Sequence, residues 1–209
     1  MKLLNVGCGS TRAGDPWVNL DELHSILKPG TPERTNLDKE QNYVDHKLPE
    51  IMPFKEGTFD GCLISHVIEH FDCQDAVRIL EDCRRILKIG GLLLVSVPDA
   101  EYFLSVYDQD TPEKAVELFG EPICPDEPWH KSFFDYALFY KQHKQVLTEG
   151  STSCLMIKAG FGNVFNLPQV KWLNLVSIKT VESPNMTVLN VIEKLMNRRK
   201  FSLEVTAVK

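Results

Sequence analysis

The sequence predicts an α/β protein with one mostly parallel sheet. Two observations support this prediction: short apolar runs of strand length recur along the first half of the chain, and a segment with helical periodicity separates two of them. The chain has 209 residues, and 43% of them are hydrophobic. This length allows one sizeable core, so we expect a single domain over residues 1–209.

The first expected element is a buried strand that runs into a glycine turn. Residues 3–6 read Leu-Leu-Asn-Val, and Gly7 and Gly9 follow directly. Glycines here let the backbone approach a nucleotide closely, because they lack a Cβ and tolerate left-handed conformations. A Gly-x-Gly turn also fits the dinucleotide fingerprint, but that pattern needs a third glycine where Arg12 stands.

A second strand is expected at Trp17–Asp21, with the carboxylate of Asp21 at its end. Ligands of open α/β sheets lie at the carboxyl ends of the strands, and a carboxylate there can accept hydrogen bonds from both hydroxyls of a ribose. Parallel strands are usually joined by a crossover of about a dozen or more residues that contains a helix. Residues 10–16 are too few for this, so we expect the first crossover helix to be vestigial.

A helix that packs on the sheet is expected from Gln74 to Lys88, where apolar residues recur at helical spacing. Asp72 or Asp75 would cap its start, and the pair Gly90-Gly91 would end it.

The C-terminal part predicts two more helices and a last strand. Ser151-Thr152-Ser153 would cap a helix through residues 155–158, which Ala159-Gly160-Phe161 would end. A further helix is expected over residues 187–198, and the alternating tail 201–208 predicts a strand that closes the sheet.

As a set, these segments resemble the class I S-adenosylmethionine-dependent methyltransferases, and most of all the small bacterial methyltransferase type 11-like group. The resemblance covers roughly residues 3–99 and rests on the glycine turn, Asp21, Asp45, the run Ser65–His70 and the Gly90-Gly91 turn before an apolar strand. It implies a Rossmann-like, mostly parallel sheet of seven strands with helices on both faces. The short lead before the first strand also implies that the family's usual N-terminal cap helix is absent.

The resemblance implies S-adenosylmethionine as the cofactor. Gly7 and Gly9 would lie against its methionine part, and Asp21 would hold the ribose. Asp45 and the backbone after it would recognise the adenine amino group. Asn5 stands where the family commonly has an acidic residue, so we expect a weaker contact near the cofactor's ammonium group. The residues expected to contact the cofactor are Asn5, Gly7, Cys8, Gly9, Asp21, Asp45, His46, Ser65 and His66.

The run from Ser65 to His70 also contains His-x-x-Glu-His, the inverted order used by one class of zinc peptidases. That motif needs a helix, whereas an apolar strand is expected to run up to Ser65, and the methyltransferase resemblance accounts for the same residues without a metal. We therefore expect no metal site. His66 would line the pocket, while Glu69 and His70 would begin the next helix.

Residues 100–150 are expected to form a substrate pocket or cap, because aromatic residues alternate there with prolines in no regular pattern. The implied reaction is direct displacement at the methyl group, which needs a base only for a hydroxyl or a protonated amine. The candidate bases are His130, His66 and His143. His130 ranks first because it lies beside Trp129 in the aromatic segment.

We expect the acceptor to be a hydroxyl of a small molecule, a sugar or a glycan, so an O-methyltransferase is favoured over an N-methyltransferase. Nucleic acid is disfavoured because the net charge is −6 and the sequence lacks the motifs of base methylation. Two alternatives stay open. One is a non-catalytic S-adenosylmethionine-binding regulatory protein, and the other is an NAD(P)-dependent reductase, which the incomplete glycine pattern disfavours.

No signal peptide and no apolar run of about 18 residues are present, which argues against a membrane partner. The six cysteines form no Cys-x-x-Cys pair and fall partly within expected strands and helices. Both observations predict a cytoplasmic protein. A homodimer is compatible with the sequence.

Overall fold

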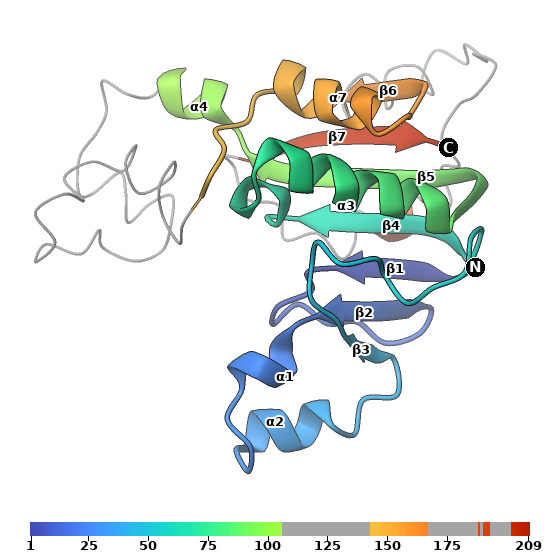
Figure 1. The fold of residues 1–209 in the computed structure, drawn as a ribbon, viewed down its shortest axis with the longest axis vertical. Helices are drawn as coiled ribbons and strands as arrows, with labels where there is room; N and C mark the ends of the chain where they lie inside the picture. Colours follow the sequence, from blue (N-terminus) through green and yellow to red (C-terminus); the bar gives the residue numbers. More distant parts are fainter. Residues whose placement is uncertain (106–142, 167–187, 189, 193–201) are drawn as a thin grey trace, which may run out of the picture.

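The computed structural model describes residues 1–105, 143–166, 188, 190–192 and 202–209 (Figure 1). In these residues, seven strands form one sheet in the order β3-β2-β1-β4-β5-β7-β6. The strands β1 to β5 pair in parallel, and β7 runs antiparallel to both β5 and β6. The predicted mostly parallel α/β sheet is therefore confirmed. The strands are β1 (Leu3–Val6), β2 (Trp17–Asp21), β3 (Tyr43–Asp45), β4 (Phe59–Ser65), β5 (Leu87–Pro98), β6 (Asn163–Asn166) and β7 (Ser202–Val208).

Helical elements cover both faces of the sheet. α3 and α7 lie on one face, where they share a hydrophobic core with alternate residues of the central strands (Figure 1). On the other face, Val188 and Ile192 pack against Leu3 and Leu63. The central strands are buried on both faces, which explains why most of their residues are apolar. The helical elements are α1 (Leu23–Ile26), α2 (Pro32–Leu37), the 3-10 helix η1 (Ile68–His70), α3 (Cys73–Ile86), α4 (Ala100–Ser105) and α7 (Glu149–Lys158).

The connection from β1 to β2 contains no helix, as predicted. Asparagine side chains hold it instead. Asn5 donates from Nδ2 to the carbonyl of Thr11 at 2.7 Å, and Asn19 exchanges two hydrogen bonds with the backbone of Ala13. Asn42 donates from Nδ2 to the carbonyl of Ala13 at 2.6 Å. Since Asn5 and Asn19 are almost fully buried, their amides satisfy loop backbone groups that a crossover helix would pair internally.

The predicted end of the long helix was wrong. Asp72 caps α3, because its carboxylate accepts a hydrogen bond from the amide of Asp75 at 2.9 Å. The helix ends at Ile86, however, and Gly90 lies inside β5 with φ +75°. Leu87 is completely buried and pairs with Phe59 of β4, so burial of this side chain starts the strand before the glycines are reached.

The predicted cap of α7 was also wrong. The helix begins at Glu149, and Thr148 is its cap: Thr148 Oγ1 accepts from the amide of Ser151 at 3.2 Å, and Ser151 Oγ accepts from the amide of Thr148 at 2.8 Å. Ser151 is therefore the third residue of a capping box. The stop at residues 159–161 is confirmed, since Gly160 (φ +89°) and Phe161 donate back into the last helical turn.

Two other predictions fall largely outside the described residues. Of the helix expected over residues 187–198, positions 188 and 190–192 are described and are helical. Of the expected pocket segment 100–150, α4 and residues 143–150 are described. None of the helices in the described ranges combines the length and the hydropathy that a bilayer crossing needs.

Candidate cofactor site and active site

Strand register places the predicted site residues along one edge of the sheet. Asp21 pairs with Asp45 across β2 and β3, and Ser65 pairs with Ser96 across β4 and β5. Gly7 directly follows β1. The last residue of β1, Val6, pairs with Leu20 of β2 and with Ile64 of β4, and each of these lies one position before the end of its strand. In Figure 1, the arrowheads of β1, β2 and β4 point to the side where α1 and α4 lie. This edge is the carboxyl end of the parallel strands, where ligands of such sheets bind.

The carboxylate of Asp21 holds the glycine turn against the end of β2. Its Oδ2 accepts a hydrogen bond from the amide of Gly9 at 2.7 Å, and its Oδ1 accepts one from the amide of Glu22 at 2.7 Å. The amides of Gly7 and Cys8 donate to the carbonyl of Leu20. A carboxylate has about four acceptor positions, so Asp21 keeps capacity for the two hydroxyls of a ribose.

The two glycines meet different surroundings. Gly7 has φ +66°, and a Cβ at this position would lie 2.4 Å from Cγ2 of Val67. Gly9 has φ +49°, and a Cβ there would have no heavy atom within 4 Å. Gly7 is thus needed for packing, whereas Gly9 borders open space beside the Asp21 carboxylate. This arrangement fits the close approach of a nucleoside cofactor to the backbone.

Gly7→Ala and Gly9→Ala should therefore separate stability from binding. Both substitutions force an alanine into a left-handed conformation, at a cost of roughly 1–2 kcal/mol. Gly7→Ala adds overpacking against Val67, worth about 1–3 kcal/mol more. In urea unfolding, Gly7→Ala should be the less stable variant, while Gly9→Ala should stay folded and bind S-adenosylmethionine more weakly in calorimetric titration. Equal losses of stability, or unchanged binding by Gly9→Ala, would contradict this division.

The predicted adenine side of the site is built around Asp45. Its Oδ1 accepts a hydrogen bond from the amide of His24 at 2.9 Å and lies 2.9 Å from the hydroxyl of Tyr43. Burial first, and then hydrogen bonding to Asp45, raise the pKa of Tyr43, so its phenol stays protonated. His46 donates from its backbone amide to the carbonyl of Asp21 at 2.9 Å. Its ring Nε2 lies 3.0 Å from the carbonyl of Glu50.

Arg12 and Tyr43 are two site-building residues that the sequence did not predict. Arg12 donates from Nε to both carboxylate oxygens of Glu40, at 3.0 and 2.9 Å, and from Nη1 to the carbonyl of Gly9 at 3.1 Å. The sequence signal for Arg12 was its position, since an arginine stands where the dinucleotide fingerprint has its third glycine.

Cys8 lies in the same turn, and burial, with a smaller contribution from Asp21, raises the pKa of its thiol to about 12. The thiol is therefore no nucleophile near neutral pH.

His66 stands at the end of β4 in the left-handed region, with φ +55°. Its backbone amide donates to the carbonyl of Ser96 at 2.8 Å. Its ring Nε2 lies 2.9 Å from Oγ of Ser202, and its Nδ1 lies 3.4 Å from Oε1 of Glu69. With the proton on Nδ1, facing the carboxylate, Nε2 accepts from the Ser202 hydroxyl. The sequence did not predict Ser202, because it reaches the site only through strand pairing.

His143 lies beside His70, the last residue of η1. The rings of His70 and His143 are edge to face, with centroids 4.6 Å apart. The structure thus brings two of the three candidate bases, His66 and His143, to the segment that follows β4. The third, His130, lies outside the described residues.

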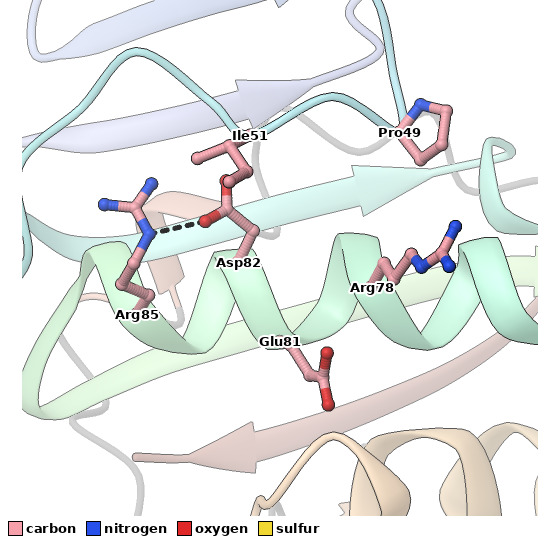
Figure 2. Close-up of a pocket in the computed structure, with 6 residues that line it drawn as sticks. All are labelled: Pro49, Ile51, Arg78, Glu81, Asp82 and Arg85. Carbon is pink, nitrogen blue, oxygen red and sulfur yellow. Dashed lines mark hydrogen bonds and ion pairs between the residues drawn. The ribbon is translucent and has the colours of Figure 1, made fainter.

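A surface pocket lies elsewhere, on the outer side of α3 (Figure 2). Its acidic and basic side chains are partly paired, since Asp82 accepts a hydrogen bond from Arg85 and another from the amide of Met52 at 2.6 Å. None of the predicted site residues lines this pocket, so it is not the candidate active site. Its lining residues are Pro49, Ile51, Arg78, Glu81, Asp82 and Arg85.

Comparisons with known proteins point to the same part of the chain. A family model described as a methyltransferase domain matches residues 4–95. The human mitochondrial ubiquinone biosynthesis O-methyltransferase is 31% identical over 106 residues, which cover 46% of this chain and 28% of that protein. The match therefore spans less than a third of this relative's length.

Solved structures give the fold. A S-adenosylmethionine-dependent methyltransferase of Thermotoga maritima superposes with a TM-score of 0.51 at 16% identity, over 100% of this chain and 82% of that chain. Another from Archaeoglobus fulgidus gives 0.50 at 15% identity, over 100% and 86% of the two chains. At such identities the likeness shows the fold alone. Residues 4–95 thus match a methyltransferase domain, and the strand order is that of the Rossmann-like fold of S-adenosylmethionine-dependent methyltransferases.

Proposed function

We propose that this chain transfers a methyl group from S-adenosylmethionine to a hydroxyl oxygen of a small molecule, a sugar or a glycan. One observation carries the choice of oxygen. At the carboxyl edge of the sheet, the imidazole of His66 lies between the buried carboxylate of Glu69 and the hydroxyl of Ser202. This is the environment of a general base that removes a proton from a hydroxyl.

The residues that would hold the cofactor are those of the glycine turn and the two strand-ending carboxylates. Gly9 leaves space beside Asp21, whose carboxylate would accept the ribose hydroxyls. Asp45 lies one strand further out, in register with Asp21, where it would accept from the adenine amino group. When bound, the sulfonium cofactor supplies an electrophilic methyl group. The protein's own contribution is then mainly to orient the acceptor, an effect worth up to about 7–11 kcal/mol in well-oriented reactions.

His66 would take the acceptor proton on Nε2. Glu69 faces Nδ1, so it favours the tautomer with a free lone pair on Nε2 and stabilises the imidazolium that forms. Ser202 shows that a hydroxyl fits at hydrogen-bonding distance from Nε2. We propose that the acceptor hydroxyl takes its place. The left-handed conformation of His66 supports a role in function, since such strain in a non-glycine residue is concentrated at functional sites.

Further points support the proposed acceptor and setting. The human relative is named as an O-methyltransferase. Residues 100–150 remain our candidate for the acceptor pocket, with His130 as a second candidate base within it. Cys8, Cys62 and Cys83 are buried free thiols, which fits our proposal of a reducing, cytoplasmic setting.

A ligand panel tests the proposal in two steps. At about a hundredfold excess over its dissociation constant, a ligand of the native state adds about 2.7 kcal/mol of stability. We expect S-adenosylmethionine and S-adenosylhomocysteine to raise the melting temperature and NAD and NADP to leave it unchanged. Transfer of a radiolabelled methyl group is then measured on phenols, sugars and amines. A shift with NAD or NADP would favour the reductase, and binding without transfer to any acceptor would favour a regulatory protein.

A further inference from the structure

In the segment after β4, the carboxylate beside His66 also lies next to two further histidines. We propose that Glu69, His70 and His143 bind a divalent transition-metal ion, with Zn²⁺ as the best-matched ion. This departs from the sequence-based expectation of no metal. The binding concerns these residues alone and does not depend on whether the chain transfers methyl groups.

The three side chains converge from two distant parts of the chain. One ligand atom from each lies within 4.8 Å of the others, and the two imidazole rings are 4.6 Å apart. Zn²⁺ binds nitrogen and carboxylate oxygen at about 2.0–2.2 Å, so two ligands of a tetrahedral ion are roughly 3.4 Å apart. Closing the site therefore requires side-chain movements of about an ångström.

The burial of Glu69 is an independent sign of a missing cation. Its side chain is 1% exposed, and within the described part of the chain neither carboxylate oxygen has a hydrogen-bond partner. Nδ1 of His66 lies 3.4 Å from Oε1 but does not complete a hydrogen bond. A buried carboxylate without donors is unfavourable, and coordination of a cation is a common way in which proteins compensate it.

The backbone holds the third ligand in place. The carbonyl of Glu69 accepts hydrogen bonds from the amides of Lys144 and Gln145, at 2.8 and 3.2 Å. The side chain of Gln145 donates to the carbonyl of Phe71 at 2.8 Å. These bonds tie the residues next to His143 to η1 before any ion binds. The site is thus largely preorganised, which favours binding.

The ligand types select the ion. Two imidazoles and one carboxylate form the His₂Glu set that binds catalytic zinc and leaves a fourth position open. Mg²⁺ and Ca²⁺ prefer oxygen ligands, so this set disfavours them. His66 also lies against the carboxylate of Glu69, but it would not bind the ion itself. It would instead orient Glu69 as a ligand.

The test uses Co²⁺ as a spectroscopic substitute for Zn²⁺, added to chelator-treated full-length protein without cofactor or acceptor. We expect one Co²⁺ per chain, a visible absorption band of low-coordinate cobalt, and loss of that band on addition of Zn²⁺. Glu69→Gln and His143→Gln should each weaken Co²⁺ binding at least tenfold. The matched control is His24→Gln, since His24 also lies beside carboxylates, 3.2 Å from Asp38 and 3.7 Å from Asp45, but on α1. It should bind as the wild type does.

Circular dichroism of the metal-free variants checks folding, and His143→Gln keeps the test open if Glu69→Gln does not fold, because His143 is only partly buried. Zn²⁺ should raise the melting temperature of the wild type and of His24→Gln but not of the two site variants. Absence of the cobalt band in the wild type would overturn the proposal. So would its persistence in folded His143→Gln, or its loss in His24→Gln. None of these results depends on methyl transfer, so failure of the metal site and failure of the proposed function are told apart.

Discussion

Asp21→Asn is expected to raise the dissociation constant for S-adenosylmethionine by at least about a hundredfold. A hydrogen bond to a charged acceptor contributes about 1.5–3 kcal/mol, and Asp21 would accept two from the ribose. Removing the charge weakens both of these hydrogen bonds and costs about 3 kcal/mol of binding free energy, which is roughly a hundredfold in affinity. Isothermal titration calorimetry with the cofactor measures this directly.

The same carboxylate also accepts from the amides of Gly9 and Glu22. Asparagine keeps one side-chain oxygen for these donors, so the metal-free and cofactor-free protein should lose only about 1 kcal/mol of stability. The matched control is Asp38→Asn, which removes one charge from a half-exposed carboxylate that pairs with Arg34 on α2. It should bind the cofactor normally. If Asp21→Asn also binds normally, the ribose does not lie at this strand end.

The fold was predictable where burial is decided locally. The central strands are enclosed on both faces, so β1 and β4 appear in the sequence as short, mostly apolar runs, and Asp21 could be placed at a strand end from its own segment alone. The end of α3 was not predictable in this way. The glycine rule favoured Gly90, but the burial of Leu87 against β4 starts the strand three residues earlier.

The site was predictable only in part, because strand pairing brings together residues that have no signal in common. Ser202 reaches His66 across 136 positions of sequence, since β7 inserts antiparallel next to β5. His143 reaches His70 from the segment before α7. Asn5 was interpreted from its place in the family as a weaker contact to the cofactor. In the structure its side-chain amide donates to the carbonyl of Thr11. That carbonyl needs a side-chain donor only because the first crossover has no helix.

His66→Gln is expected to lower kcat by about two to four orders of magnitude, the usual contribution of a general base, with little change in the affinity for S-adenosylmethionine. Glutamine can still hydrogen-bond to Ser202, but it cannot take up a proton near neutral pH. Single-turnover methyl transfer measures the rate, and calorimetric titration measures the affinity for the cofactor.

Ser202→Ala is the matched comparison, because it removes the hydroxyl that His66 contacts and leaves the imidazole and Glu69 in place. If the acceptor replaces Ser202 at Nε2, this variant should keep most of its turnover. A loss in Ser202→Ala as large as that in His66→Gln would mean that the serine itself carries the proton. An unchanged kcat in His66→Gln would instead remove His66 from the chemistry and leave His130 and His143 as the candidate bases.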